Sequence, residues 1–566
     1  MPHCHGGEAL APTYEFGSSA SWGVHLIFRT VGEEHRHYAP RVGKSQDATP
    51  VRLAELVASL SLGIDLGFGQ PMEHVLRQCL IALRLGELLG CDEVERGTIY
   101  YTALLVNVGC HSDAHEQTKW FGDDIALKAT KYEHEPFGLR DAMNMVRLIG
   151  SGTPPLHRVR TGLEFAISGR REVSDMLARH AGLARELGAQ LGLPDAVLDA
   201  LGASYERWDG RGWPGLVAGD AIPIASRVVQ LAEFAEVAHR VGGIDAAVAL
   251  AQRRRATQFD PLVVDTMCLD AVKVFGEIDD VGSWDIVIDA EPSLAIALSG
   301  QQCDDALVAI SRFVDLKSPF TVGHSTAVAE LTAAAGRQLG LPDDEAHVLY
   351  RAGLVHDFGR LGVSNSIWDK RGPLGAGEWE RVRLHPYFTE RMLQQSPTLA
   401  PLARIAVQHR ERLDGSGYPR GLTGSAISSD ARILGAADAY QAMREPRPYR
   451  HPLTAAGAAV ELRTDVRAGR LDSDAVEAVL FEAGHRVVRR REGPAGLTAR
   501  EVEVLRLVAC GHSNKEVAAR LVISAKTAGN HIEHIYTKIG TSNRAGASLF
   551  AMRHGLLPEE GFSTDQ

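Results

Sequence analysis

The 566-residue chain has no apolar run long enough to cross a membrane, and only 6% of its residues are aromatic. A helix that spans a bilayer needs roughly 20 consecutive, mostly apolar residues. The amino-terminal segment also lacks the basic-then-apolar order of a secretory signal. The sequence therefore predicts a soluble, cytoplasmic protein without a membrane partner.

The seven cysteines are scattered and form no CxxC pair, which argues against a disulfide framework or a structural zinc site. Strand-like alternation is scarce as well. Long stretches such as VLRQCLIALRLGELLG and AVAELTAAAGRQLGL instead carry apolar residues at i, i+3 and i+4 spacing. The sequence therefore predicts an all-α fold.

Charge is distributed unevenly along the chain. The net charge is −11, but residues 497–557 carry +4, which leaves −15 on the rest. With roughly 100–200 residues per domain, this length predicts about three domains. We expect a poorly ordered tail (1–50), two helical domains (51–290 and 291–484), a linker (485–496), a small basic domain (497–557) and a final tail (558–566).

The two helical domains have the features of a diverged duplication. His74 and Asn107 are 33 residues apart, and His324 and Asp357 have the same spacing. Further on, ERWDGRGWP (206–214) matches ERLDGSGYP (411–419). The first copy has about 45 extra residues, around Lys128 to Glu172, between its two matching segments.

The second copy holds histidines and aspartates suited to divalent metals such as iron, manganese or zinc. A carboxylate can bridge two ions about 3.5–4 Å apart, which is a common arrangement for phosphoester hydrolysis. The alternative is a set of unrelated surface histidines. The candidate ligands are His324, His356, Asp357, His385, His409 and Asp438.

The first copy serves as an internal comparison. It has Val106, Asn107, Ser204 and Glu233 in place of His356, Asp357, His409 and Asp438, and only His74 is unchanged. Losing an imidazole and a carboxylate removes both ligands and charge. We expect this copy to bind metal weakly or not at all and to serve in packing, pairing or sensing.

The second copy resembles the HD-GYP phosphodiesterases, on the motifs GHS, HDFG, HRERLDGSGYPRGL, ARILGAADAY and RPYR. The resemblance covers about residues 300 to 455. It implies a helical domain that holds two or three metal ions, often iron or manganese, and hydrolyses a cyclic dinucleotide such as cyclic di-GMP. It also implies that the six candidate residues are metal ligands and that Asp357 is catalytic.

The resemblance further places substrate near the loop Gly417, Tyr418 and Pro419. Tyr418 can stack on or hydrogen-bond the nucleotide, or can be an ordinary turn tyrosine. Arg447 and Arg450 of RPYR can hold a phosphate or remain solvated.

Two positions depart from the family pattern. Arg410 stands where the family has a second histidine, and Arg360 stands where it has a lysine. Arg410 removes a ligand and adds a fixed positive charge, so we expect two metal ions rather than three. Arg360 can still hold a phosphate and is a candidate catalytic residue.

The basic domain carries the signals of short helices. Thr498 with Glu501 and Ser513 with Glu516 fit capping boxes. Ser524 is placed to cap a third helix, from about Ala525 to Ile539, that ends at Gly540. Three helices in about 43 residues predict a helix-turn-helix fold.

This domain resembles the LuxR-type DNA-binding domain over its whole length. The resemblance implies that the third helix enters the major groove of double-stranded DNA, often as a homodimer. Lysines supply phosphate contacts, and the exposed polar face of this helix meets the base edges. The expected DNA-binding residues are Lys515, Lys526, Thr527, Gly529, Asn530, Glu533 and Lys538.

The sequence thus predicts a metal-dependent cyclic-dinucleotide phosphodiesterase joined to a transcriptional regulator. One alternative is a catalytically weak or inactive HD-GYP domain that senses a nucleotide. Another is an HD phosphohydrolase that acts on a different nucleotide.

Overall fold

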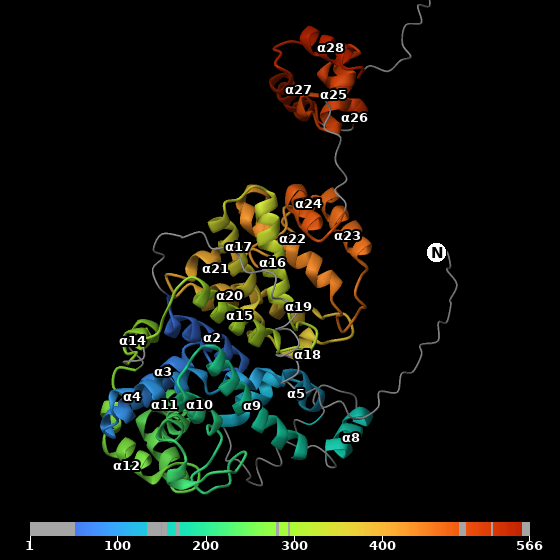
Figure 1. Cartoon of the computed structure of the whole chain (residues 1–566). Helices are drawn as coiled ribbons and strands as arrows, with labels where there is room; N and C mark the ends of the chain where they lie inside the picture. Colours follow the sequence, from blue (N-terminus) through green and yellow to red (C-terminus); the bar gives the residue numbers. More distant parts are fainter. Residues whose placement is uncertain are drawn as a thin grey trace, which may run out of the picture. The chain divides into compact units, whose positions relative to one another are not determined.

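The computed structural model describes residues 51–132, 149, 155–165, 170–278, 282–292, 295–485, 494–521 and 524–556, and the statements below concern these residues. They are almost entirely helical, as predicted (Figure 1). The predicted tails and most of the linker lie outside them. None of the described helices is both long and apolar enough to span a membrane.

The first copy consists of helices joined by short 3-10 turns. Its elements are β1 (Val51–Arg52), α2 (Leu53–Gly67), α3 (His74–Leu88), α4 (Glu93–Leu105), η1 (Val108–His111), α5 (Ala114–Phe121), α6 (Asp124–Ala129), η2 (Thr130–Tyr132), α8 (Pro155–Glu164), α9 (Arg170–Gln190), α10 (Asp195–Gly202), η4 (Gly219–Ala221), α11 (Ile224–Arg254), α12 (Pro261–Leu269), α13 (Ala271–Phe275) and α14 (Ser283–Asp289). Helix α11 is kinked where Gly242 and Gly243 leave helical geometry.

The second copy repeats this order in a shorter form. Its elements are β2 (Ala297–Leu298), α15 (Gln301–Asp315), α16 (His324–Gln338), α17 (Asp343–Val355), η5 (Phe358–Gly362), α18 (Asn365–Trp368), α19 (Ala376–Arg383), α20 (His385–Leu393), α21 (Ala400–Ala406), η6 (Gly424–Ala426), α22 (Ser429–Arg444), α23 (Ala455–Arg467) and α24 (Ser473–Glu482). Helices α3 and α16 begin at His74 and His324, the positions that the predicted duplication aligns.

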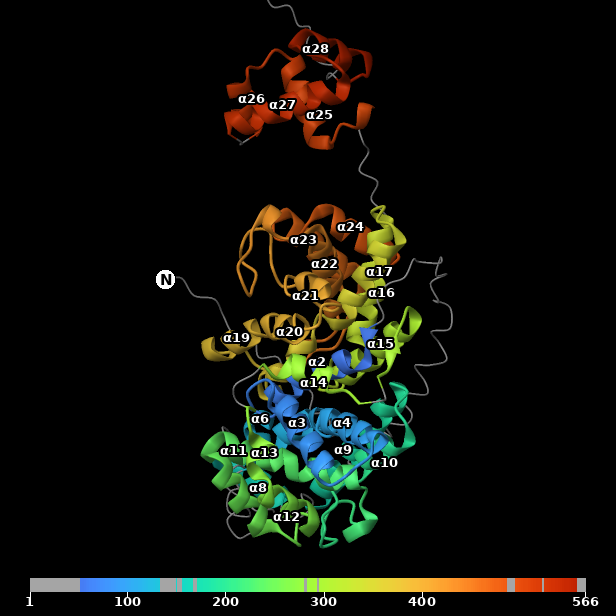
Figure 2. The same ribbon diagram turned by 90° about the vertical axis from the view of Figure 1, so that its left-hand side faces the viewer.

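The two copies share a packed boundary formed by their first helices. Helix α2 lies beside α15 and α20 in both views (Figures 1 and 2). A Cβ atom on Gly63 would lie 2.9 Å from the Leu361 side chain, so α2 packs closely on η5. In a second contact between the copies, His111 Nε2 of the first copy lies 2.6 Å from the Phe313 carbonyl of α15. The first copy therefore contacts the segment that directly follows Asp357.

Strands β1 and β2 add a small antiparallel link across the same boundary, since Val51 pairs with Leu298 and Arg52 with Ala297. Arg52 also donates to Glu291 Oε2 at 2.6 Å, just before the second copy. These contacts bring the starts of the two copies together.

The carboxyl-terminal domain has four helices: α25 (Ala499–Ala509), α26 (Asn514–Leu521), α27 (Ala525–Ile539) and α28 (Arg544–Arg553), preceded by η7 (Pro494–Gly496). The capping box of Thr498 and Glu501 is confirmed, and the bounds of α27 agree with the prediction. Helix α28 was not predicted. Its residues Ala547 and Ala551 complete a core with Leu505, Val517 and Ile535.

Candidate functional site

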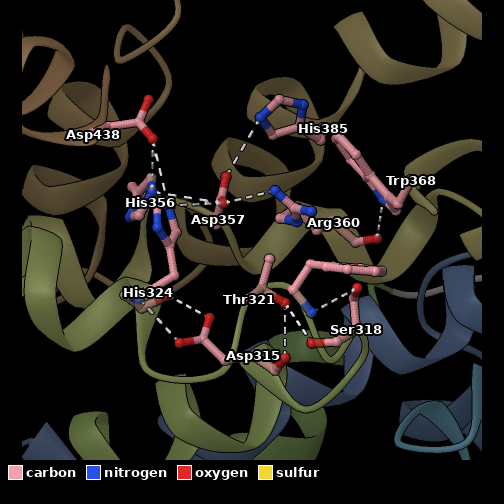
Figure 3. Close-up of polar contacts among 12 residues, drawn as sticks. Asp315, Ser318, Thr321, His324, His356, Asp357, Arg360, Trp368, His385 and Asp438 are labelled. Carbon is pink, nitrogen blue, oxygen red and sulfur yellow. Dashed lines mark hydrogen bonds and ion pairs between the residues drawn. The ribbon is translucent and has the colours of Figure 1, made fainter. Parts of the chain in front are cut away.

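Six buried side chains of the second copy converge from separate elements. His324 begins α16, His356 and Asp357 follow α17, His385 begins α20, His409 follows α21, and Asp438 lies in α22. Each exposes 1% of its surface or less. The structure therefore brings all six predicted ligands together, and the alternative of unrelated surface histidines is wrong. Figure 3 labels five of them, all except His409.

The Asp357 carboxylate lies at the centre of this cluster and faces two groups of ligands. Its Oδ2 atom is 3.7 Å from Nε2 of both His324 and His356. Its Oδ1 atom is 3.5 Å from His385 Nε2 and 3.6 Å from His409 Nε2. A carboxylate with imidazoles on both sides is suited to bridging two cations.

Asp438 belongs to the first of these groups. Its Oδ1 atom is 3.4 Å from His324 Nε2 and 4.0 Å from His356 Nε2. The ligand atoms of His324, His356 and Asp438 lie within 4.8 Å of one another, and so do those of His356, Asp357 and His409. His356 is common to both triads, so the two triads are adjacent.

Backbone contacts fix which nitrogen of each imidazole faces the cluster. The Nδ1 atoms of His356, His385 and His409 lie 2.6–2.7 Å from the carbonyl oxygens three residues before them. A carbonyl only accepts, so Nδ1 carries the proton and Nε2 presents its lone pair. The Nε2 atoms of His385 and His409 are 3.3 Å apart, and two lone pairs cannot bond each other.

Several of these ligand atoms are buried without a hydrogen-bond partner among the described residues. They are His324 Nε2, His356 Nε2, Asp357 Oδ1 and Asp438 Oδ2. An unsatisfied buried polar atom is costly, whereas a bound cation satisfies several at once. The donor set of imidazole and carboxylate therefore fits divalent metal ions.

Electrostatics keep His356, His385 and Asp357 in the protonation states that metal binding needs. Burial lowers the pKa of His356 to about 4 and the pKa of His385 well below its usual value, so both rings are neutral. Burial alone would raise the pKa of Asp357, but His356 and Arg360 outweigh it and hold the pKa far below its usual range. Asp357 is therefore an anion.

His324 is oriented by a residue that the sequence analysis missed. Its Nδ1 atom lies 3.0 Å from the Glu445 carboxylate, and Glu445 also accepts from Arg447 Nη2 at 2.8 Å. A carboxylate behind a ligating histidine fixes its orientation and increases its basicity. Glu445 lies two residues before the RPYR motif and belongs to none of the motifs on which the family resemblance rests.

The two arginines that depart from the family pattern both contact carboxylates of the cluster. Arg360 Nη1 lies 3.2 Å from Asp357 Oδ2, and its guanidinium carbon lies 4.0 Å from the centroid of the Trp368 ring. Arg410 Nη2 lies 3.2 Å from Asp438 Oδ1. Two fixed positive charges therefore lie at the edge of the cluster (Figure 3 shows Arg360).

The loop of Gly417, Tyr418 and Pro419 lies against the cluster. The Tyr418 ring is 5.9 Å from the His385 ring in an edge-on arrangement. A Cβ atom on Gly417 would clash with the Glu411 backbone, so this position needs glycine. The Glu411 carboxylate closes the loop by accepting from the backbone N–H of Arg420 at 2.7 Å.

The two arginines of RPYR have different surroundings. Arg447 is beside the cluster through Glu445, and its Nη1 donates to the Phe320 carbonyl at 2.9 Å. Arg450 instead donates to the carbonyls of Ala442 and Met443, at 2.5 and 3.1 Å, at the end of α22. The Arg450 guanidinium thus caps a helix terminus.

In the first copy, a lysine ammonium lies where the second copy has its cluster. Lys131 Nζ is 2.6 Å from Glu233 Oε1 and 3.2 Å from Asn107 Oδ1, the counterparts of Asp438 and Asp357. The rings of Phe68, Tyr132, Tyr205 and Phe234 surround this ammonium at 5.6–5.8 Å. Lys131 and Tyr132 come from the extra residues of the first copy, so the insertion itself supplies the cation.

The structure also corrects the comparison of the two copies. The carbonyl of His180 packs on Gly109 as the carbonyl of His385 packs on Gly359. His180 and Ser204 are 24 residues apart, as are His385 and His409. His74 is therefore not the only retained histidine. The 45-residue insertion before His180 displaced it from its expected spacing.

In the carboxyl-terminal domain, most of the predicted DNA-binding residues are exposed. Lys526, Thr527, Asn530 and Glu533 are exposed on α27, Gly529 is half-buried there, and Lys515 is exposed on α26. Lys538 instead lies 2.9 Å from Glu501 Oε2, so its ammonium supports the capping box of α25.

The fold defines two tandem HD-type helical domains followed by a helix-turn-helix domain, and comparisons with known proteins agree. Residues 309–475 match the family model described as HD domain, and residues 495–551 match the bacterial regulatory proteins of the luxR family. The 3'3'-cGAMP-specific phosphodiesterase 3 of Vibrio cholerae serotype O1 is 32% identical over 402 residues, 70% of this chain and 87% of that protein. The chain belongs to the HD-GYP phosphodiesterase family.

Other relatives match over shorter stretches. A cyclic di-GMP phosphodiesterase of Pseudomonas aeruginosa is 38% identical over 27% of this chain and 37% of its own length. A crystal structure of a cyclic GMP-AMP specific phosphodiesterase from V. cholerae has a TM-score of 0.54 and 28% identity, covering 77% of this chain and 98% of that one. The 402-residue match is longer than residues 291–566 together, so the likeness extends into the first copy.

Proposed function

We propose that the second copy is a metal-dependent phosphodiesterase that hydrolyses a 3'3'-linked cyclic dinucleotide. The observation that carries this proposal is the Asp357 carboxylate, which is buried between two groups of imidazoles whose Nε2 atoms face it. The relatives named for cyclic GMP-AMP and cyclic di-GMP hydrolysis support the substrate class.

Two divalent ions, with iron or manganese as first choice, fit this donor set. His324, His356, Asp357, His385, His409 and Asp438 would hold these ions. When bound, such ions activate a water molecule and stabilise charge on the phosphoryl oxygens. We expect no metal in the first copy, because the Lys131 ammonium already neutralises Glu233.

The residues around the cluster have distinct proposed roles. Arg360, fixed by the Trp368 ring, and Arg447 are placed to hold phosphate oxygens. Tyr418, in the loop shaped by Gly417 and Pro419, is placed to contact a base. Because its guanidinium is bonded to the end of α22, Arg450 would support this loop region rather than bind phosphate.

The experiment that tests this function combines metal analysis with product analysis on the full-length protein. We expect two metal ions per chain and conversion of 3'3'-cGAMP or cyclic di-GMP to a linear dinucleotide or to mononucleotides. Hydrolysis of only a non-cyclic nucleotide would mean that the protein is an HD phosphohydrolase of another class. Metal-loaded protein that is inert toward every substrate would contradict the proposal.

A second candidate function is a nucleotide sensor that binds without efficient turnover. It is favoured by the two guanidinium groups that pair with Asp357 and Asp438 and so compete with metal ions for these carboxylates. The two candidates make different predictions at Arg410.

We expect Arg410→His to tighten Mn²⁺ binding by about tenfold, because it removes a positive charge and supplies an imidazole beside Asp438. Calorimetric titration of metal-free protein measures the change. Arg420→His is the matched control, because Arg420 is exposed and pairs with Glu390 at 2.6 Å on the surface. Unchanged affinity in Arg410→His would mean that Arg410 does not limit metal binding.

We also propose that the carboxyl-terminal domain binds double-stranded DNA through α27, as a homodimer on paired half-sites. Its likeness to the luxR family supports this, together with the exposed polar face of α27. Lys515 and Lys526 would contact phosphates, while Thr527, Gly529, Asn530 and Glu533 would approach base edges. Such a partner implies action in the cytoplasm.

We expect Lys526→Ala to weaken binding similarly on all DNA sequences and to reduce the slope of log K against log salt by about 1, since one phosphate contact is lost. Fluorescence anisotropy over a series of salt concentrations measures this slope. Lys273→Ala is the control, because Lys273 is an exposed lysine of the first copy. A slope that stays constant in Lys526→Ala would remove Lys526 from the DNA interface.

A further inference from the structure

The first copy contains a cavity of about 270 Å³ next to Lys131. Its walls include the counterparts of second-copy site residues: Ser204 for His409, Tyr205 for Arg410, Trp213 for Tyr418 and Glu233 for Asp438. The cavity therefore lies at the place in the first copy that corresponds to the cluster of the second copy. Ser204 stands in place of the His409 imidazole, and the Tyr205 ring stands in place of the Arg410 guanidinium.

The loop that carries Trp213 has the same construction as the loop that carries Tyr418. Gly212 packs on the Glu206 backbone as Gly417 packs on that of Glu411. The Glu206 carboxylate closes its loop by accepting from the Leu216 N–H at 2.7 Å. The loop of the first copy thus has the same backbone construction as the Tyr418 loop of the second copy, and it carries the larger ring of Trp213 in place of tyrosine.

The charged groups in the cavity wall are already neutralised by partners. Lys131 pairs with Glu233 at 2.6 Å, and Lys128 pairs with Asp124 at 3.2 Å. Arg207 pairs with Asp209 at 2.9 Å. A phosphate would have to displace one of these carboxylates, so the cavity favours a neutral ligand.

The uncharged lining is rich in rings and carboxamides. Phe68, Tyr205, Trp213 and Phe234 supply flat apolar surfaces. Gln117 is buried, its Nε2 atom meets only the Met176 sulfur at 3.6 Å, and its Oε1 atom has no donor among the described residues. A thioether is a weak acceptor, so this amide remains available for a polar ligand. Aromatic faces beside a free carboxamide are suited to a heterocyclic base.

We propose that the first copy binds one neutral nucleoside in this cavity, with its base stacked on Trp213 and hydrogen-bonded to Gln117. The volume lies just below the ~300–1,000 Å³ that is usual for drug-sized ligands, which suits one base with its sugar rather than a cyclic dinucleotide. The choice of a nucleoside as the ligand class rests on the proposed function of the second copy. The existence of the cavity and the identity of its lining residues do not depend on that function.

The test is calorimetric titration of the full-length Asp357→Ala protein with adenosine, guanosine, cytidine and uridine. This background removes the metal centre, so binding is independent of whether the second copy is a phosphodiesterase. We expect one site per chain for at least one nucleoside. We also expect Trp213→Ala and Gln117→Leu each to weaken binding by about tenfold or more, because each removes a stacking or hydrogen-bonding partner.

Tyr418→Ala is the matched control, since it makes the same kind of change at the corresponding loop of the second copy. It should leave nucleoside affinity unchanged. Circular dichroism of each variant shows whether the fold is kept, and Gln117→Leu retains the side-chain volume if Trp213→Ala does not fold. The proposal is overturned if no nucleoside binds at millimolar concentration, or if Tyr418→Ala weakens binding while Trp213→Ala and Gln117→Leu do not.

Discussion

Replacing Asp357 with alanine should abolish both metal retention and cyclic-dinucleotide hydrolysis. Asp357 is the one carboxylate that faces both imidazole groups, so its loss removes a ligand from each proposed metal position. It also leaves Arg360 without its partner at 3.2 Å, so that a fixed positive charge faces the metal positions. We expect kcat/KM to fall by a factor of about 10³ or more, which corresponds to roughly 4 kcal/mol of transition-state stabilisation. Inductively coupled plasma mass spectrometry and chromatography of the products measure the two effects.

Asn107→Ala is the matched control, because Asn107 occupies the same position in the first copy and contacts Glu233 and Lys131. It should leave the metal content and kcat/KM within about twofold of wild type, since it is remote from the reacting groups. Full activity in Asp357→Ala would contradict the proposed site. Equal losses in both variants would show that the assay reports folding.

The six candidate ligands of the second copy could be predicted because they occur in an ordered set of motifs. Their geometry could not be predicted. The position of Asp357 between two imidazole groups depends on how α16, α17, α20 and α22 pack, and so does the pairing of His324 with Glu445. Neither follows from distance along the sequence.

Insertion explains the errors in the first copy. A comparison at fixed spacing fails after residue 128, so His180 was not recognised as the counterpart of His385. The loss of ligands was visible from Val106 and Ser204. The contacts of the Lys131 ammonium with Glu233 and Asn107 were not visible, because Lys131 lies in sequence that has no counterpart in the second copy.

Local signals were more reliable in the carboxyl-terminal domain. The hydroxyl groups of Thr498 and Ser524 accept from backbone N–H groups of α25 and α27 as the capping rules predict. The missed helix α28 begins with a similar signal, since the Asn543 side chain accepts from the Gly546 N–H at 2.9 Å. Helix α28 was missed because its sequence, RAGASLFAMR, is short and has small residues such as alanine at several positions of its apolar pattern.

The boundary between the two copies was not predictable at all, and it contains a buried charge cluster. Asp124 of the first copy lies 3.2 Å from Lys128 Nζ and 3.4 Å from Lys317 Nζ of the second copy. Its other oxygen accepts from Ser364 Oγ at 2.7 Å and from the Asn365 N–H at 2.8 Å. Burial would raise the pKa of Asp124, but the two lysines outweigh it and hold the pKa below its usual range.

Asp124→Ala should therefore destabilise the paired copies by about 3–5 kcal/mol, because two buried lysines lose their shared counter-ion. Burial already lowers the pKa of Lys317 to about 8. Urea titration followed by circular dichroism measures the change in the free energy of unfolding.

Asp220→Ala is the control. Asp220, like Asp124, pairs with a basic side chain, in this case Arg227 at 3.1 Å, but the Asp220 side chain is 91% exposed. The expected loss is therefore about 0.5 kcal/mol or less. Comparable losses in both variants would mean that the boundary cluster contributes no more than a surface ion pair. A large loss in Asp124→Ala alone would show that the first copy supports the segment that follows Asp357, since Asp124 bonds Ser364 and Asn365 directly after η5.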